Sequence, residues 1–132
     1  MTRALFPLAV GLAFATAWGC GSSTDKPKTT AVKGIVTVDG KPMPEGEIYF
    51  VLSGQAPTTF PVKDGAFSGT GNVGKNAVEI RAYKTGPALL GDPNKSPTKV
   101  NTIPARFSDL SKLTADVTEG GANDFKFEIN SK

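Results

Sequence analysis

Few side chains in this sequence can carry out chemistry. Histidine is absent from all 132 residues, which removes the commonest general base near neutral pH and the commonest neutral metal ligand. Cys20 is the only thiol, and the serines and lysine of residues 108–112 lack the S-x-x-K spacing of serine–lysine hydrolases. We therefore predict that the protein is not an enzyme, requires no cofactor and holds no zinc ion.

Oxygen-bearing side chains in predicted turns are the remaining candidates for binding. Asp92 and Asn94 are two residues apart, but a calcium site needs several converging oxygens, and no D-x-D-x-D run is present. Turn formation is the simpler interpretation of both residues. Glycans stack on exposed aromatic rings, for which Tyr83 and Phe60 are the candidates, although a neighbouring loop can cover either ring. The candidate interaction residues are therefore Tyr83, Asp92 and Asn94.

The first twenty residues have the composition of an export signal. Arg3 supplies a positive charge, and residues 4–18 contain no charged side chain. This apolar run is shorter than the roughly 20 residues of a membrane-spanning helix, and Pro7 and Gly11 argue against a buried core helix. An ordinary secretory leader and a lipoprotein leader both fit these features.

The residues before the cysteine favour the lipoprotein leader. Ala17-Trp18-Gly19-Cys20 resembles the bacterial lipobox, although leucine is usual at the position of Ala17 and a small residue at that of Trp18. The resemblance implies a signal peptide over residues 1–19 and acylation of Cys20 by chains such as palmitate. An exported protein with one cysteine has no internal disulfide partner, and several acyl chains anchor a protein stably where one is marginal.

Two further parts follow the predicted cleavage point. Residues 20–30 form a predicted flexible tether, because residues 21–30 contain no apolar side chain that could offset the entropy of ordering. Residues 31–130 form the predicted folded domain. The net charge is only +3, from 15 basic and 12 acidic residues spread along the chain, so nucleic acid is not expected as a partner.

Short runs of alternating apolar and polar residues fill the predicted domain. Val78 and Ile80 alternate with Glu79 and Arg81 in the clearest of these runs, whose charged face is expected to be solvated. Glycine, proline and Asp-Gly pairs separate the runs. The predicted strands lie at 32–38, 47–52, 58–62, 66–68, 77–84, 113–117 and 125–129, with a short extended piece at 103–107.

Two features of this pattern set the predicted fold. Pro61 lacks a backbone donor and therefore suggests that its strand lies at a sheet edge. Residues 85–102 are the longest unpatterned segment, with three prolines and two glycines, and such a loop is usually functional or disordered. Seven or eight short strands without a convincing helix predict an all-β fold, an antiparallel β-sandwich.

Several motifs resemble those of carboxypeptidase regulatory-like domains, which are transthyretin-like (prealbumin-like) sandwiches. The motifs are Val36-Thr37-Val38-Asp39-Gly40-Lys41-Pro42, the Asp64-Gly65-Ala66-Phe67 hairpin, Ile103-Pro104-Ala105-Arg106-Phe107 and the terminal Asn123-Asp124-Phe125-Lys126-Phe127. The chain departs from the family at Asn76, where an aromatic residue is usual. Because asparagine buries less apolar area than an aromatic ring, a looser corner is expected there.

The sequence thus predicts a non-catalytic accessory or interaction module of the bacterial cell envelope. The protein is expected to be exported and anchored to a membrane through lipid on Cys20, with an unidentified protein or envelope component as its partner. The alternative is a glycan- or calcium-binding envelope protein that uses residues 85–102. The two differ in whether that segment borders a concave pocket with a polar lining.

Overall fold

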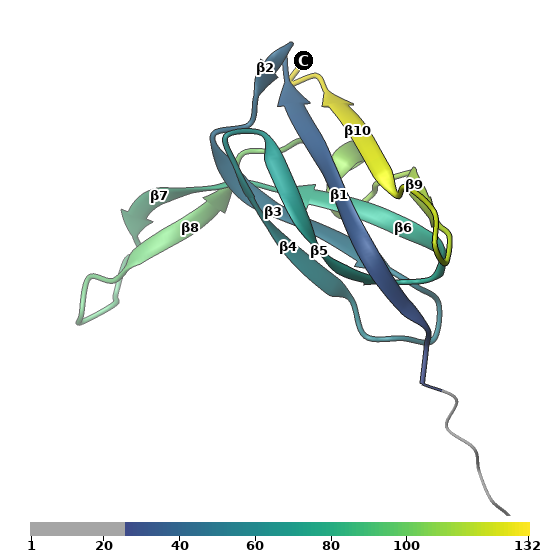
Figure 1. Cartoon of the computed structure of the whole chain (residues 1–132). Helices are drawn as coiled ribbons and strands as arrows, with labels where there is room; N and C mark the ends of the chain where they lie inside the picture. Colours follow the sequence, from purple (N-terminus) through teal and green to yellow (C-terminus); the bar gives the residue numbers. More distant parts are fainter. Residues whose placement is uncertain (1–25) are drawn as a thin grey trace, which may run out of the picture.

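The computed structural model describes residues 26–132, which form an almost entirely β structure (Figure 1). The predicted signal peptide, Cys20 and the first half of the predicted tether lie outside the described residues. The elements are β1 (Thr29–Val38), β2 (Lys41–Pro42), β3 (Glu45–Val51), β4 (Thr58–Lys63), β5 (Ala66–Asn72), β6 (Gly74–Arg81), β7 (Tyr83–Ala88), β8 (Pro97–Asn101), the 3-10 helix η1 (Ala105–Phe107), β9 (Leu113–Val117) and β10 (Asp124–Ile129).

The strands form one large curled sheet and one small sheet. The large, eight-stranded sheet has the order β10-β1-β5-β4-β3-β6-β9, with β2 paired to β1, and β7 and β8 form the second sheet. All pairs are antiparallel except β1 with β10, which run parallel from Lys33 opposite Asp124 to Val38 opposite Ile129. The predicted all-β sandwich is confirmed, with this one parallel pair as a difference.

The large sheet becomes a sandwich by turning at the hairpin between β4 and β5. Asp64 and Gly65 form its two-residue turn with φ values of 51° and 78°, a conformation that this residue pair adopts readily. Lys63 and Ala66 are the only registered pair between the two strands, so β4 and β5 diverge directly after the turn. One layer then contains β10, β1 and β5, and the other contains β4, β3, β6 and β9.

Phe50 of β3 fills the space between the two layers. Its buried ring makes edge contacts with four other phenylalanines, with centroid distances of 5.3, 6.0, 5.8 and 6.4 Å to Phe60, Phe67, Phe125 and Phe127. Glycine in β1 makes room for this cluster, because a Cβ atom on Gly34 would lie 2.7 Å from the ring of Phe67. The aliphatic side chains that complete the core are Val32, Val36, Met43, Ile48, Val62, Val78, Ile80, Ile103, Val117 and Ile129.

Several strand boundaries and edges differ from the prediction. The strand predicted at 77–84 is divided, because β6 ends at Arg81 and β7 begins at Tyr83, and β5 extends to Asn72. β1 begins at Thr29, two residues before the expected start of the domain, and Thr29 pairs with Asn72 of β5. Residues 105–107, expected to be extended, form η1. β4 is not an outermost strand as Pro61 suggested, but Pro61 lies where β4 has already left β5 and therefore needs no donor on that side.

The largest correction concerns residues 85–102. They were predicted to form a long loop, but β7 and β8 pair from Tyr83 opposite Asn101 to Ala88 opposite Pro97, with an irregularity between Gly86 and Ala88. This β7–β8 hairpin projects away from the sandwich (Figure 1). Neither of its strands joins the large sheet.

We predict that Phe50→Ala lowers the free energy of unfolding by about 3 to 5 kcal/mol, because it empties the centre of the core. Urea denaturation followed by circular dichroism measures this change. The control is Leu110→Ala, whose side chain is 72% exposed, and its effect should stay within about 0.5 kcal/mol. Equal effects of the two substitutions would contradict the assignment of Phe50 to the core.

Candidate functional site

The base of the β7–β8 hairpin is tied to the sandwich by the residues next to it. Asn101 accepts hydrogen bonds on Oδ1 from the backbone N–H groups of Ala82 and Ile103, at 3.2 and 3.1 Å. Thr102 donates its backbone N–H to the carbonyl of Ala82 at 2.7 Å, and the side chain of Ile103 enters the core. The hairpin is therefore held at its base by specific contacts.

The tip of the hairpin, which we define as residues 89–96, is a turn organised by Asp92. One oxygen of its carboxylate accepts the backbone N–H of Asn94 and the other accepts that of Ser96, both at 2.9 Å. These bonds, that from Asn94 first, lower the pKa of Asp92 from its ordinary value. The carboxylate thus has a turn-forming role, and the side chain of Asn94 is exposed to solvent.

Exposed apolar side chains gather on this hairpin. Leu89 is 70% exposed and Leu90 is completely exposed, while Tyr83 and Val100 are each 42% exposed. Among residues 26–132, only Ile35 and Leu110 are other large apolar residues with comparable exposure. Four of the six large apolar side chains that are exposed in the described chain therefore lie on the hairpin.

A polar cluster lies on the outer face of β3 and β6, beside the hairpin. Arg81 contacts the carboxylates of Glu79 and Asp109 at 2.9 and 2.8 Å, and its guanidinium lies 5.4 Å from the centroid of the Tyr49 ring. The hydrogen bond with Glu79 is the main cause that raises the pKa of Arg81. The sequence predicted that Glu79 and Arg81 share this face, but not Asp109, which comes from the distant loop after η1.

Tyr49 completes this cluster. Its hydroxyl donates a hydrogen bond to the carboxylate of Glu47, and this bond, followed by desolvation, raises the pKa of Tyr49 from 10.0 to about 12. The cluster pairs the charge of Arg81 with carboxylates on an outer sheet face. It therefore serves to hold β3, β6 and the loop after η1 together.

A groove of about 310 Å³ separates the hairpin base from β3 and β4. Its lining includes Tyr83, two acidic residues and three lysines, and the full set is Glu45, Gly46, Glu47, Pro61, Val62, Lys63, Tyr83, Lys84, Thr85 and Lys99. The segment 85–102 thus does border a concave surface with polar side chains.

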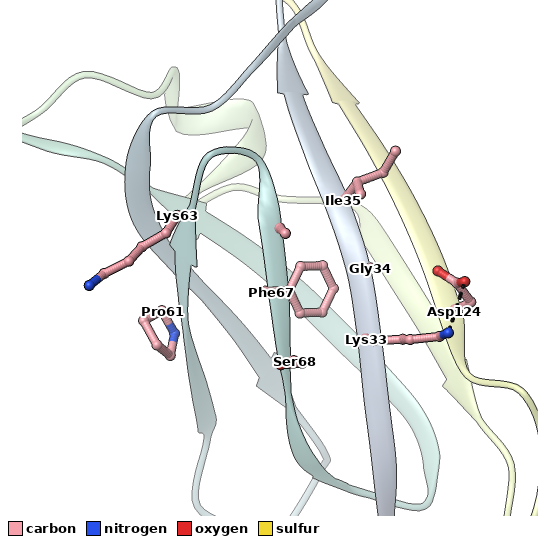
Figure 2. Close-up of a pocket in the computed structure, with 9 residues that line it drawn as sticks. Lys33, Gly34, Ile35, Pro61, Lys63, Phe67, Ser68 and Asp124 are labelled. Atoms are coloured by element: carbon pink, nitrogen blue, oxygen red, sulfur yellow. Dashed lines mark ion pairs between the residues drawn. The ribbon is translucent and has the colours of Figure 1, made fainter.

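A second groove, of about 480 Å³, runs over β1 and β5 between β4 and β10 (Figure 2). Phe67 lies in its middle, Pro61 and Lys63 line one side, and Lys33 pairs with Asp124 on the other at 3.8 Å. Figure 2 shows the ammonium group of Lys63 directed away from that ion pair. No set of polar groups converges in this groove, so its geometry favours no particular ligand.

The candidate residues from the sequence do not form one site. Tyr83 lies at the base of the hairpin, whereas Asp92 and Asn94 lie at its tip, at the other end of the strand pair. Phe60, the other candidate for a glycan platform, is buried in the core, so that interpretation of Phe60 was wrong. Cys20 lies outside the described residues.

Asn76 lies at the corner that the sequence predicted to be loose. Its side chain is completely buried, and its amide group donates to the carbonyls of Asn72 and Gly74, each at 2.9 Å. Its Oδ1 atom is buried without a hydrogen-bond donor among residues 26–132. Two backbone contacts therefore fix the corner where an aromatic ring was expected.

Neither a metal cluster, nor a membrane-spanning helix, nor a related protein identifies a function for residues 26–132. Within residues 26–132 there is no cluster of three or more His, Cys, Asp or Glu side chains placed to hold a metal ion. The same part of the chain contains no helix with the length and apolar character needed to cross a membrane. Comparison with protein-family models, curated proteins and solved structures finds no match.

We predict that Tyr49 ionises with a pKa of about 12 in the folded protein. A Tyr83→Phe variant leaves Tyr49 as the only tyrosine, and its phenolate absorbance can be followed against pH. Since folding raises this pKa, the stabilisation is complete below pH 10 and disappears as the pH rises to about 12. Adding Glu47→Gln should move the midpoint towards 10.0; a midpoint that stays unchanged would contradict the contact.

Proposed function

We propose that this protein is a non-catalytic accessory or interaction module of the bacterial cell envelope, anchored to a membrane through lipid on Cys20. One observation carries the interaction role. The β7–β8 hairpin projects from a closed sandwich and presents two adjacent leucines, Leu89 and Leu90, to solvent (Figure 1). Exposed apolar groups of this kind are typical of a surface that binds another molecule.

The two serines of residues 108–112 support the non-catalytic part of the proposal. Ser111 donates its hydroxyl to the carbonyl of Val78, and the same oxygen accepts the backbone N–H of Leu113. Ser108 is buried, and its hydroxyl lies 3.4 Å from the carbonyl of Pro104. Within residues 26–132 both hydroxyls bond to backbone groups and neither bonds to a basic side chain that would activate it.

The turn geometry supports membership of the carboxypeptidase regulatory-like, transthyretin-like class. Asp39-Gly40 and Asp64-Gly65 are the family-like turns, and all four residues have positive φ, between 49° and 78°. Each pair closes a two-residue hairpin, between β1 and β2 and between β4 and β5. Both turns thus act as joints between strands, which supports the resemblance.

We expect acylated Cys20 to hold the mature protein in the membrane fraction. Mass spectrometry of that fraction should show a chain beginning at Cys20 with added acyl mass, and Cys20→Ser should lose this mass and its membrane retention. The matched control, Ser22→Ala, should keep both. Anchoring by lipid would be refuted by a native chain without acyl mass, or by a Cys20→Ser protein that remains in the membrane.

The groove beside the hairpin favours a second candidate function, the binding of an envelope glycan. Tyr83 provides an exposed aromatic ring, and Glu45, Lys84 and Lys99 provide polar groups around it. Titration calorimetry with soluble cell-wall glycan fragments tests this function. Saturable binding that Tyr83→Ala abolishes would favour it, whereas binding that is absent or insensitive to this substitution would exclude the groove.

A further inference from the structure

We propose that the tip of the β7–β8 hairpin inserts its leucines into the headgroup boundary of an anionic membrane. This inference rests on the proposed function, because it names the partner of the hairpin in a protein that is already held at a membrane. It rests on four observations about the hairpin: its apolar tip, its backbone hydrogen bonds, its charge and its position relative to the start of β1.

The first observation is the shape of the apolar surface. Leu89 and Leu90 are consecutive, belong to the turn between β7 and β8, and are both strongly exposed. The hairpin that carries them projects from the sandwich (Figure 1). A lipid interface accepts such side chains without a matching pocket, and the burial of apolar area provides the driving force. Leu110, the other strongly exposed leucine of the described chain, has no leucine beside it in sequence.

The second observation is that four backbone N–H groups of the tip, those of Asp92, Asn94, Lys95 and Ser96, have hydrogen-bond acceptors within it. The N–H of Asp92 bonds to the carbonyl of Leu89 at 3.2 Å, and that of Lys95 bonds to the carbonyl of Asp92 at 3.1 Å. The carboxylate of Asp92 accepts the N–H groups of Asn94 and Ser96, and Pro93 has none to satisfy. Because lipid chains offer no hydrogen-bond partners, this internal pairing lowers the cost of approach to the bilayer.

The third observation is the charge of the hairpin. Residues 83–101 contain three lysines, Lys84, Lys95 and Lys99, against the single acidic residue Asp92, which gives a net charge of +2. All three lysines are exposed, and none forms an ion pair with another residue of the described chain. Glu45 and Glu47 lie across the groove from Lys84 and Lys99, whereas Lys95 is at the tip. Lysines beside an apolar tip are attracted to anionic headgroups.

The fourth observation is where the chain leaves the domain. In Figure 1 β1 begins at the lower right of the domain and the hairpin tip lies at the lower left, and both are away from the C-terminus at the top. Cys20 precedes Lys26 by six residues, which reach at most about 20 Å when extended. A lipid on Cys20 would therefore hold the start of β1 near the membrane, with the hairpin tip on the membrane side.

Depth-dependent fluorescence quenching tests this placement in the mature, acylated chain. Cleavage before Cys20 removes Trp18, the only tryptophan of the sequence, so Leu90→Trp places the single reporter at the tip. The acylated protein is reconstituted on vesicles of phosphatidylglycerol and phosphatidylcholine, with and without bromine on the acyl chains. The matched control carries Leu110→Trp, which places the same reporter on an exposed leucine outside the hairpin.

We expect the tryptophan at position 90 to shift to shorter wavelength and to be quenched by brominated lipid, and the one at position 110 to show neither effect. Replacing Lys95, the lysine at the tip, with glutamine should weaken insertion about fivefold on anionic vesicles and leave neutral vesicles unaffected.

Two results would overturn the inference, and they are distinguishable. A vesicle-bound protein whose tryptophan at position 90 stays unquenched would refute insertion while lipid anchoring stands, and would leave a protein partner as the occupant of the tip. A protein that does not bind the vesicles would refute the anchoring and the insertion together.

Discussion

The ring of Phe50 is the contact on which the sandwich depends. It belongs to β3, yet it touches rings from β4, β5 and β10, so one side chain joins strands from both layers. The layers can close around it because β4 and β5 separate directly after the Asp64-Gly65 turn, and because Gly34 leaves room for the neighbouring ring of Phe67. Aromatic burial of this size supplies a large part of the driving force for folding in a small domain.

The closed core also determines which part of the chain remains available for binding. β7 and β8 pair with each other and contribute no side chain to the group of buried core residues. Asn101, Thr102 and Ile103 fasten the base of this hairpin to the sandwich, whereas Leu89 and Leu90 at its far end contact solvent. The molecule thus separates a folding unit from an attached element that is free to interact.

The sequence predicted the strands that bury one face, because burial imposes the alternation seen at Val78 and Ile80. It did not predict β7 and β8, since neither of their faces joins the core and their pairing leaves no alternation to detect. The contacts of Arg81 with Asp109 and of Asn76 with Asn72 depend on how distant or bent segments meet, which local patterns do not encode. Tyr83 is exposed, as a candidate interaction residue must be, but the arrangement of residues 85–102 as a hairpin with an apolar tip required the structure.

Nuclear magnetic resonance of the isotopically labelled full chain tests whether residues 83–101 form an ordered hairpin outside the core. The register of β7 and β8 predicts cross-strand contacts between the backbones of Lys84 and Val100 and between those of Thr85 and Lys99. The hydrogen bond at the base also predicts contacts from Ala82 to Thr102. Random-coil chemical shifts through residues 85–102, without these contacts, would contradict an ordered hairpin.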